Sequence, residues 1–150
     1  MSVIDWEILN DIETAVGEVS EIKTVLTTVC EGTVDVPAAG FPAALVLWQE
    51  TRERLSGADS GELIGRVKFV ISVLVRDADR SRGLESTLSL ANDIRNAVMA
   101  DHTRSGLASA TEDGAGTELG PAVVVEGRKP PLLEVRLRGS CGYFVPGRGD

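Results

Sequence analysis

Cysteine, histidine and aromatic side chains are scarce in this sequence. Its 150 residues include two cysteines, one histidine and 4% aromatic residues. Cys30 and Cys141 form no CxxC or Cys/His cluster, and one histidine leaves the chain short of the about four soft ligands that structural zinc needs. We therefore expect two free thiols in a reducing cytoplasm, no metal site and a core built from aliphatic side chains.

Long apolar segments are absent as well. The longest apolar run, FVISVLV at 69–75, has the length of a strand, whereas a helix needs roughly 20 apolar residues to cross a bilayer. The first residues, MSVIDWEILNDIE, contain no cationic region, so they do not resemble a signal peptide. These observations predict a soluble protein that is made in the cytoplasm and has no membrane partner.

No run of lysine and arginine offsets the formal net charge of −8. Binding to nucleic acid needs a local basic surface that neutralises phosphates, so we do not expect specific DNA binding. DNA could still pass along an acidic surface, because repulsion prevents it from sticking. The apolar fraction of 43% and the charged fraction of 25% are close to globular averages and favour a folded chain.

Apolar residues at helical spacing predict two helices. Steps of three and four residues from Ile4 to Val29 predict one long amphipathic helix over 4–29, with Asp5 as its N-cap. A second helix is predicted after 77–83, capped by Asp79 or Ser81. Its apolar stripe consists of Leu84, Leu88, Ala91, Ile94 and Val98.

Alternating apolar residues predict the strands, which lie at 43–55, 63–77, 121–127 and 132–139. The segment CGYFV extends the last strand or forms a short one of its own, and 110–120 is predicted as a polar loop. The fold class is thus α+β: a mostly antiparallel sheet of about four strands, in the order α-β-β-α-β-β, with two helices packed on one face. We expect residues 1–145 to form one domain and 146–150 a flexible tail.

The stretch AVMADHTRSGLASA, at 97–110, places His102 beside Asp101, Thr103 and Ser105. Neighbouring residues on a helix point about 100° apart, so Asp101 does not orient the imidazole as a catalytic partner would. Gly106 suits the left-handed position at which helices end. We therefore interpret this stretch as a helix end and predict no enzyme activity, no catalytic residue and no cofactor.

Charged strand residues and polar loops are the candidates for an interaction surface. Arg136 and Arg138 alternate with Glu134 on one strand, and all three are expected to be solvated, as is Glu126. Arginine is also enriched at protein interfaces, and long loops are often functional, which directs attention to 56–61 and 107–120. The interface candidates are Arg52, Arg54, Ser56, Asp59, Glu112, Asp113, Arg136 and Arg138.

The segment RVKFVISVLVRDADRSRGLESTLSLANDIRNAVMADHTRSGLA, at 66–108, resembles the central part of tail terminator proteins of long-tailed bacteriophages, the family of minor tail protein U. Asp101, Thr103 and Gly106 match the family's D-x-T-L-x-G segment, with Arg104 where leucine is usual. The resemblance extends over about 40–145 and includes the aromatic pair Tyr143 and Phe144 near the end of the last strand.

The resemblance implies a structural protein of the virion. Tail terminators form a ring, usually a hexamer, that caps the finished tail tube, stops its polymerisation and presents a joining surface to the head-tail connector or head-closure protein. DNA passes through the ring without specific binding. The alternatives are another neck, head-closure or tail-completion protein, a small dimeric binding module of host metabolism, or an enzyme whose site assembles between subunits.

Overall fold

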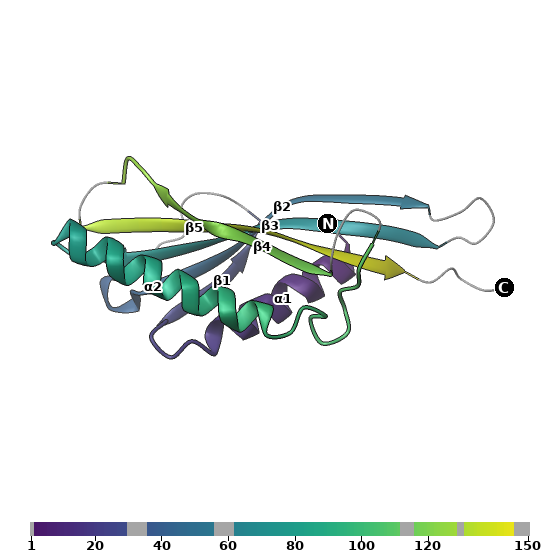
Figure 1. The fold of residues 1–150 in the computed structure, drawn as a ribbon, viewed down its shortest axis with the longest axis horizontal. Coiled ribbons are helices and arrows are strands. Elements are labelled where there is room, and N and C mark those ends of the chain that lie inside the picture. Colours follow the sequence, from purple (N-terminus) through teal and green to yellow (C-terminus); the bar gives the residue numbers. More distant parts are fainter. Residues whose placement is uncertain (1, 30–35, 56–61, 112–115, 129–130, 146–150) are drawn as a thin grey trace.

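A computed structural model describes residues 2–29, 36–55, 62–111, 116–128 and 131–145. The elements are α1 (Val3–Gly17), β1 (Thr24–Thr28), the 3-10 helix η1 (Ala38–Gly40), β2 (Ala43–Leu55), β3 (Leu63–Arg76), α2 (Arg80–Met99), β4 (Thr117–Val125) and β5 (Leu132–Val145). Both α-helices lie on one face of the sheet, and β2 and β3 extend together beyond them (Figure 1). None of the described helices is long and apolar enough to cross a membrane.

The sheet has five strands in the order β1-β2-β3-β5-β4. Strands β2, β3, β5 and β4 are joined by antiparallel pairs, whereas β1 pairs with β2 in parallel. The predicted α+β class and the placement of two helices on one face are confirmed. The predicted sheet of about four strands in the order α-β-β-α-β-β roughly fits and differs in one detail: β1, between α1 and β2, adds a fifth strand and a parallel pair.

The long helix predicted over 4–29 is about half as long in the structure. Helix α1 ends at Gly17, and the chain then turns into β1. The apolar spacing continues past Gly17, but Val25 lies in a strand rich in threonine, and β-branched residues favour strands. Ser2, not Asp5, caps the helix: its hydroxyl accepts a hydrogen bond from the Asp5 amide, and the Asp5 carboxylate accepts one from the Ser2 amide.

A β-bulge in β2 decides which way the charged end of this strand faces. The register shifts between Trp48 and Glu50, where two residues of β2 oppose one of β3. An extra residue reverses the alternation of side chains beyond it. Arg52 therefore lies on the same face as Leu45 and Leu47, the face turned away from the helices.

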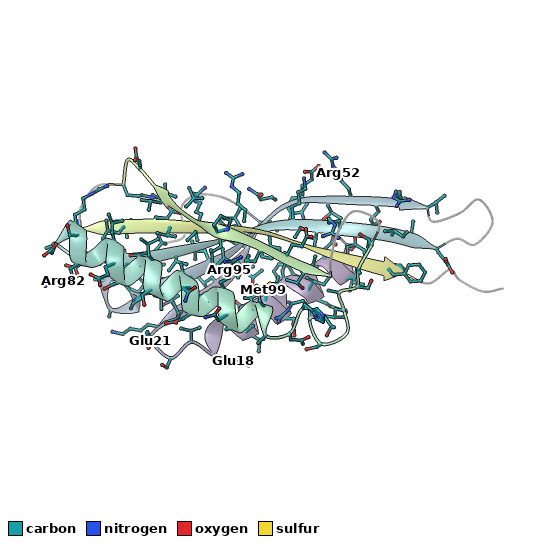
Figure 2. All side chains as sticks on the ribbon, viewed as in Figure 1. Glu18, Glu21, Arg52, Arg82, Arg95 and Met99 are labelled. Atoms are coloured by element: carbon teal, nitrogen blue, oxygen red, sulfur yellow. The ribbon has the colours of Figure 1, made fainter. Side chains whose placement is uncertain are left out.

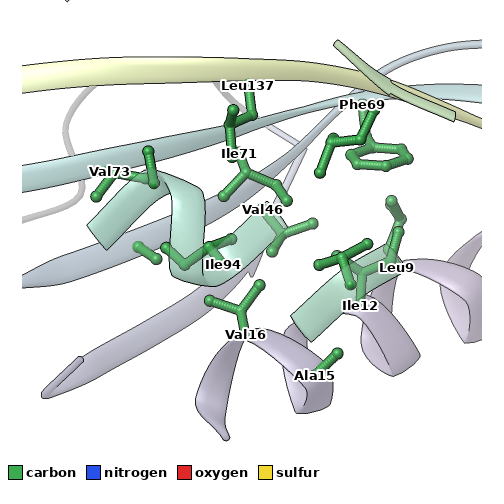
Figure 3. Packing of buried hydrophobic residues seen from close by; sticks show 14 of the residues in the cluster. Leu9, Ile12, Ala15, Val16, Val46, Phe69, Ile71, Val73, Ile94 and Leu137 are labelled. Carbon is green, nitrogen blue, oxygen red and sulfur yellow. The ribbon is translucent and has the colours of Figure 1, made fainter. Parts of the chain in front are cut away.

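Aliphatic side chains fill the space between the helices and the sheet (Figure 3). Ile12 and Val16 of α1, Ile94 of α2 and Phe69 and Ile71 of β3 are all fully buried there. Burial of apolar surface at about 25 cal/mol per Å² is the dominant favourable contribution to folding. The helix side of the sheet therefore supplies most of the stability of this fold.

The remaining predicted elements agree with the structure except near 117–120. Asp79 is the N-cap of α2, since its side chain accepts a hydrogen bond from the Arg82 amide. Strand β5 continues through CGYFV to Val145. Residues 117–120, predicted as loop, begin β4 and pair with β5 across Cys141, Ser140 and Gly139.

Candidate interaction surface

We call the sheet face turned away from the helices the open face. One part of it is apolar and partly covered, and consists of Ala43, Leu45, Leu47, Val70 and Leu74. Val36, Phe41 and Leu132 pack against this part, and the Arg76 guanidinium lies 5.8 Å from the centroid of the Phe41 ring. The stretch around η1 therefore shields this end of the open face from water.

The other part of the open face carries a group of cations that we call the cationic strip. The strip consists of Arg52, Arg54, Arg66, Lys68 and Arg138. Arg52 donates from Nε to Glu50 Oε1 at 2.6 Å and is 76% exposed, and Lys68 Nζ lies 3.8 Å from Glu50 Oε2. In Figure 2, Arg52 projects from the sheet on the side opposite the helices, and Glu18 and Glu21 lie on the helix side.

A missing side chain in β5 lets Arg66 lie across the sheet. A Cβ atom at Gly142 would meet Arg66 Nη2 at 2.9 Å and the Ser109 carbonyl at 2.7 Å. From this position Arg66 donates to Ser140 Oγ at 2.9 Å and to Thr111 Oγ1 at 3.0 Å. Its guanidinium is thus held in place while the neighbouring cations of the strip remain exposed. Four cations of the strip line one groove together with Ile64 and Glu118, namely Arg52, Arg54, Arg66 and Lys68.

Glu134 is buried, which corrects the prediction that it is solvated. Only 1% of its side chain is exposed, and its carboxylate accepts hydrogen bonds from Ser72 Oγ, from Arg128 Nε at 2.7 Å and from Arg136 Nε at 2.8 Å. Burial by itself would raise the pKa of Glu134, but the three donors outweigh it and hold the pKa below the ordinary value. Arg136 is therefore partly committed to this network within its own chain.

Four of the eight predicted interface residues lie on the open face, and the other four lie outside the described residues. Arg52, Arg54, Arg136 and Arg138 come from two strands separated by β3, and the structure brings all four to the open face. Their role in an interface stays a prediction. Ser56, Asp59, Glu112 and Asp113 lie outside the described residues.

A second surface, not predicted from the sequence, lies on the outer side of α1. Val3 and Trp6 are exposed at 76% and 42%. Glu7 is exposed next to them, and Glu13, about two turns after Trp6 on the same side of the helix, is half-buried. We call these four residues the α1 patch. Trp6 stands off the apolar stripe that runs through Ile4, Ile8 and Ile12, so its exposure could have been predicted from the spacing.

The predicted helix end near His102 is confirmed, since α2 ends at Met99, but its C-cap is Ala100 in the right-handed region and not Gly106. Asp101 accepts hydrogen bonds from the Thr103 and Ser105 amides and the Thr103 hydroxyl, and these bonds lower its pKa to about 2. Gly106 has a left-handed φ of 84°, as do Arg104 at 47° and Ser105 at 57°. The side chain of His102 is exposed, and its carbonyl accepts a bond from Thr117 Oγ1 at 2.8 Å.

Arg104, which stands where the family resemblance has leucine, fills a buried position in this corner. It is 2% exposed. It donates to the Val98 carbonyl, to the Asp101 carbonyl at 2.8 Å and to Asp11 Oδ2 at 3.1 Å. The corner after α2 is thus fastened to α1 by a hydrogen-bonded ion pair in place of an apolar contact.

The described part of the chain contains one cysteine, Cys141, which is buried, and Cys30 lies outside it. Cys141 is a free thiol, and burial raises its pKa to about 11, which leaves it protonated and unreactive at neutral pH. No group of three or more histidine, cysteine, aspartate or glutamate side chains in the described part of the chain could hold a metal ion. The four predicted interface residues that the structure describes lie together on the charged open face instead.

The fold and its surfaces define a class: a small α+β domain with one sheet face under two helices and the other face open and cationic. No protein-family model and no curated protein sequence matches the chain. A solved structure is similar in fold, namely a chain in the virion of the native gene transfer agent (GTA) particle. The two share 14% sequence identity and a TM-score of 0.50, over 97% of this chain and 100% of that chain. At this identity the likeness establishes a shared fold.

Proposed function

We propose that this chain is a structural protein of a bacteriophage-like virion and, more specifically, a tail terminator without catalytic activity. It forms a ring, taken here as a hexamer, on the finished end of the tail tube. The ring stops polymerisation of the tube protein and offers a surface to the head-tail connector or head-closure protein. The chain acts in the tail and neck of the virion, after assembly in the host cytoplasm.

The observation that carries this proposal is the full-length fold similarity to a chain of a GTA virion. The similarity spans both chains almost completely, so it does not arise from one common motif such as a hairpin. The resemblance of 66–108 to tail terminators supports the same class of protein from the sequence side.

The two charged surfaces are consistent with ring assembly. In a closed ring each subunit contacts its neighbours through two different surfaces, which must be complementary to each other. The open face carries the cationic strip, and the α1 patch on the other side of the sheet is acidic and apolar. One chain therefore presents both halves of a head-to-tail contact.

The net charge agrees with a ring through which DNA passes. At −8 the chain repels DNA phosphates as a whole, which favours passage over binding. DNA passes through the proposed ring without a specific contact.

The proposal is tested by removing the chain from an assembling particle. We expect electron microscopy of lysates that lack it to reveal overlong tails without heads, and we expect the chain supplied in trans to restore joined tails of normal length. Tails of normal length that only fail to join heads would assign the chain to head closure instead. Normal joined tails would refute the proposal altogether.

A further inference from the structure

Two surfaces of opposite character lie at the same end of this molecule, on opposite sides of the sheet. Thr51 Oγ1 of β2 donates to Asp5 Oδ2 of α1 at 2.8 Å, and Trp48 Nε1 donates to Thr51 Oγ1 at 2.9 Å. These bonds hold the start of α1 against the base of the β2–β3 hairpin. Helix α1, which carries the α1 patch, lies on the helix side of the sheet (Figure 1), and Arg52 of the cationic strip projects from the open side (Figure 2).

Each of the two surfaces combines exposed apolar side chains with charged ones, acidic on α1 and mainly cationic on the open face. In the α1 patch, Val3 and Trp6 are apolar, and Glu7 and Glu13 are acidic. On the open face, Phe144 is 44% exposed and pairs across the strands with Ile64, whose other neighbour across the strands is Arg54. Exposed aromatic anchors surrounded by complementary polar groups are typical of protein interfaces.

We propose that the α1 patch of one copy docks on the hairpin end of the open face of a second copy. The sheet itself separates the two surfaces within one chain, so they can meet only between copies. A contact between two different surfaces repeats from copy to copy and generates a ring when the rotation closes. This inference rests on the proposed function and adds the surfaces through which its ring forms.

Nucleic acid is a less suitable occupant of the cationic strip. Glu50 and Glu118 lie among its cations, with Glu50 3.8 Å from Lys68 and Glu118 3.8 Å from Arg66. Carboxylates at these positions repel phosphate groups and reduce the attraction that DNA binding depends on. A protein surface with a small number of acidic groups and an exposed aromatic side chain, such as the α1 patch, complements this mixed surface better than DNA does.

The test measures self-association of the purified full-length chain by sedimentation velocity over a range of concentrations. We expect Trp6→Ala to weaken association by about 30-fold or more, as loss of an aromatic anchor does. Leu88→Ala is the matched control, because Leu88 on α2 is equally exposed, at 41%. A chain that stays monomeric, or a Trp6→Ala variant that associates like Leu88→Ala, overturns the docking proposal.

A charge exchange tests the complementarity itself. Glu7→Arg and Arg52→Glu should each weaken association by about 10-fold, and the variant that carries both should associate more tightly than either one alone. Glu85→Arg, on the exposed side of α2, should leave association unchanged. A double variant weaker than both single variants overturns the proposal, as does DNA binding that Arg52→Glu abolishes while association is unaffected.

These results are distinguishable from a failure of the proposed function. If the charge exchange behaves as expected while particles lacking the chain have normal joined tails, the chain forms the proposed contact but is not a tail terminator. If tails become overlong while the variants associate like the wild type, the chain terminates tails through other contacts. Circular dichroism of each variant establishes that loss of association does not follow from loss of folding.

Discussion

The two faces of the sheet are stabilised by different kinds of contact. On the helix side, residues such as Phe69, Ile71 and Val135 are completely buried among other apolar side chains. At the hairpin end of the open face, the strands carry arginine, lysine and glutamate instead, in exposed ion pairs such as Arg52–Glu50 and Lys68–Glu50. Exposed ion pairs contribute about 0–1 kcal/mol each. The helix side therefore determines the fold, and the open face can vary in charge without unfolding the chain, which suits a surface for assembly.

Two neighbouring residues of β3, Phe69 and Lys68, lie on opposite faces of the sheet and should differ most in their effect on stability. We expect Phe69→Ala to lower the free energy of unfolding by about 3–5 kcal/mol, because it leaves a cavity beneath the helices. Lys68→Ala, one residue earlier and on the open face, should change it by less than about 0.5 kcal/mol. Urea unfolding followed by circular dichroism measures both values, and comparable losses would contradict the assignment of stability to the helix side.

The Glu134 network is the exception on the open face and should behave as a buried site. Glu134→Ala leaves Arg136 and Arg128 without their carboxylate, and breaking such a pair costs about 2–4 kcal/mol when the partners keep some access to water. Glu118→Ala is the control, since the Glu118 side chain is 52% exposed. Equal thermal unfolding of the two variants would show that burial of Glu134 adds nothing.

This network also makes stability depend on pH. The pKa of Glu134 in the folded chain is lower than its ordinary value of 4.5. Its contribution to stability is therefore fully present above the ordinary pKa and is lost as the pH falls through the lowered one. We expect the difference in unfolding free energy between wild type and Glu134→Gln to shrink as the pH is lowered from 7 toward acid; a constant difference would contradict the network.

Two glycines differ in the space around them: Gly65 is tightly packed, and Gly17 is not. A Cβ at Gly65 would lie 2.1 Å from Tyr143 Cζ, whereas a Cβ at Gly17 would meet nothing within 4 Å. Gly65→Ala should cost about 1–3 kcal/mol by overpacking, and Gly17→Ala should stabilise the end of α1 by up to about 1 kcal/mol. Differential scanning calorimetry measures the two changes in unfolding free energy, which should have opposite signs. A gain in stability for both variants would contradict the packing of Tyr143 on Gly65.

The corner after α2 gives the smallest expected effects. Asp101→Asn should lower the melting temperature slightly, because the pKa of Asp101 is lowered to about 2 by hydrogen bonds in the folded chain. That contribution is present above the ordinary pKa of aspartate and disappears as the pH falls toward about 2. His102→Gln should leave both folding and association unchanged. If His102→Gln abolished function in a folded chain, the interpretation of this stretch as a helix end would be wrong.

The parts of the fold that could be predicted from the sequence are those with an unambiguous period. Val67, Phe69, Ile71, Val73 and Val75 alternate strictly and form β3 as expected. The apolar spacing of three and four residues from Ile4 onward was misleading beyond Gly17, because Val19 and Ile22 continue it by coincidence while the chain turns. The β-branched residues in TVLTT were a local signal for β1, and they outweighed the spacing.

The candidate surface was predictable only in part. Arg52 and Arg54 could be expected on one strand face, but the bulge at 49 that turns them to the same side as Leu45 leaves no clear trace in the sequence. The alternation along β5 correctly placed Glu134 and Val135 on opposite faces of the sheet. It also predicted that Glu134 is exposed to solvent, which is wrong. Its burial depends on Ser72, Arg128 and Arg136 meeting around it, and such a meeting is set by tertiary structure.

The most direct test of a tail terminator is the length of tail tubes assembled in its presence. Purified chain is added to polymerising tail tube protein from the same particle, and tube lengths are measured by electron microscopy. We predict that tubes stop growing and carry a ring at one end, and that Trp6→Ala is less effective than Leu88→Ala at the same concentration. Tubes that grow to the same length with and without the chain, and that carry no ring, would contradict the account.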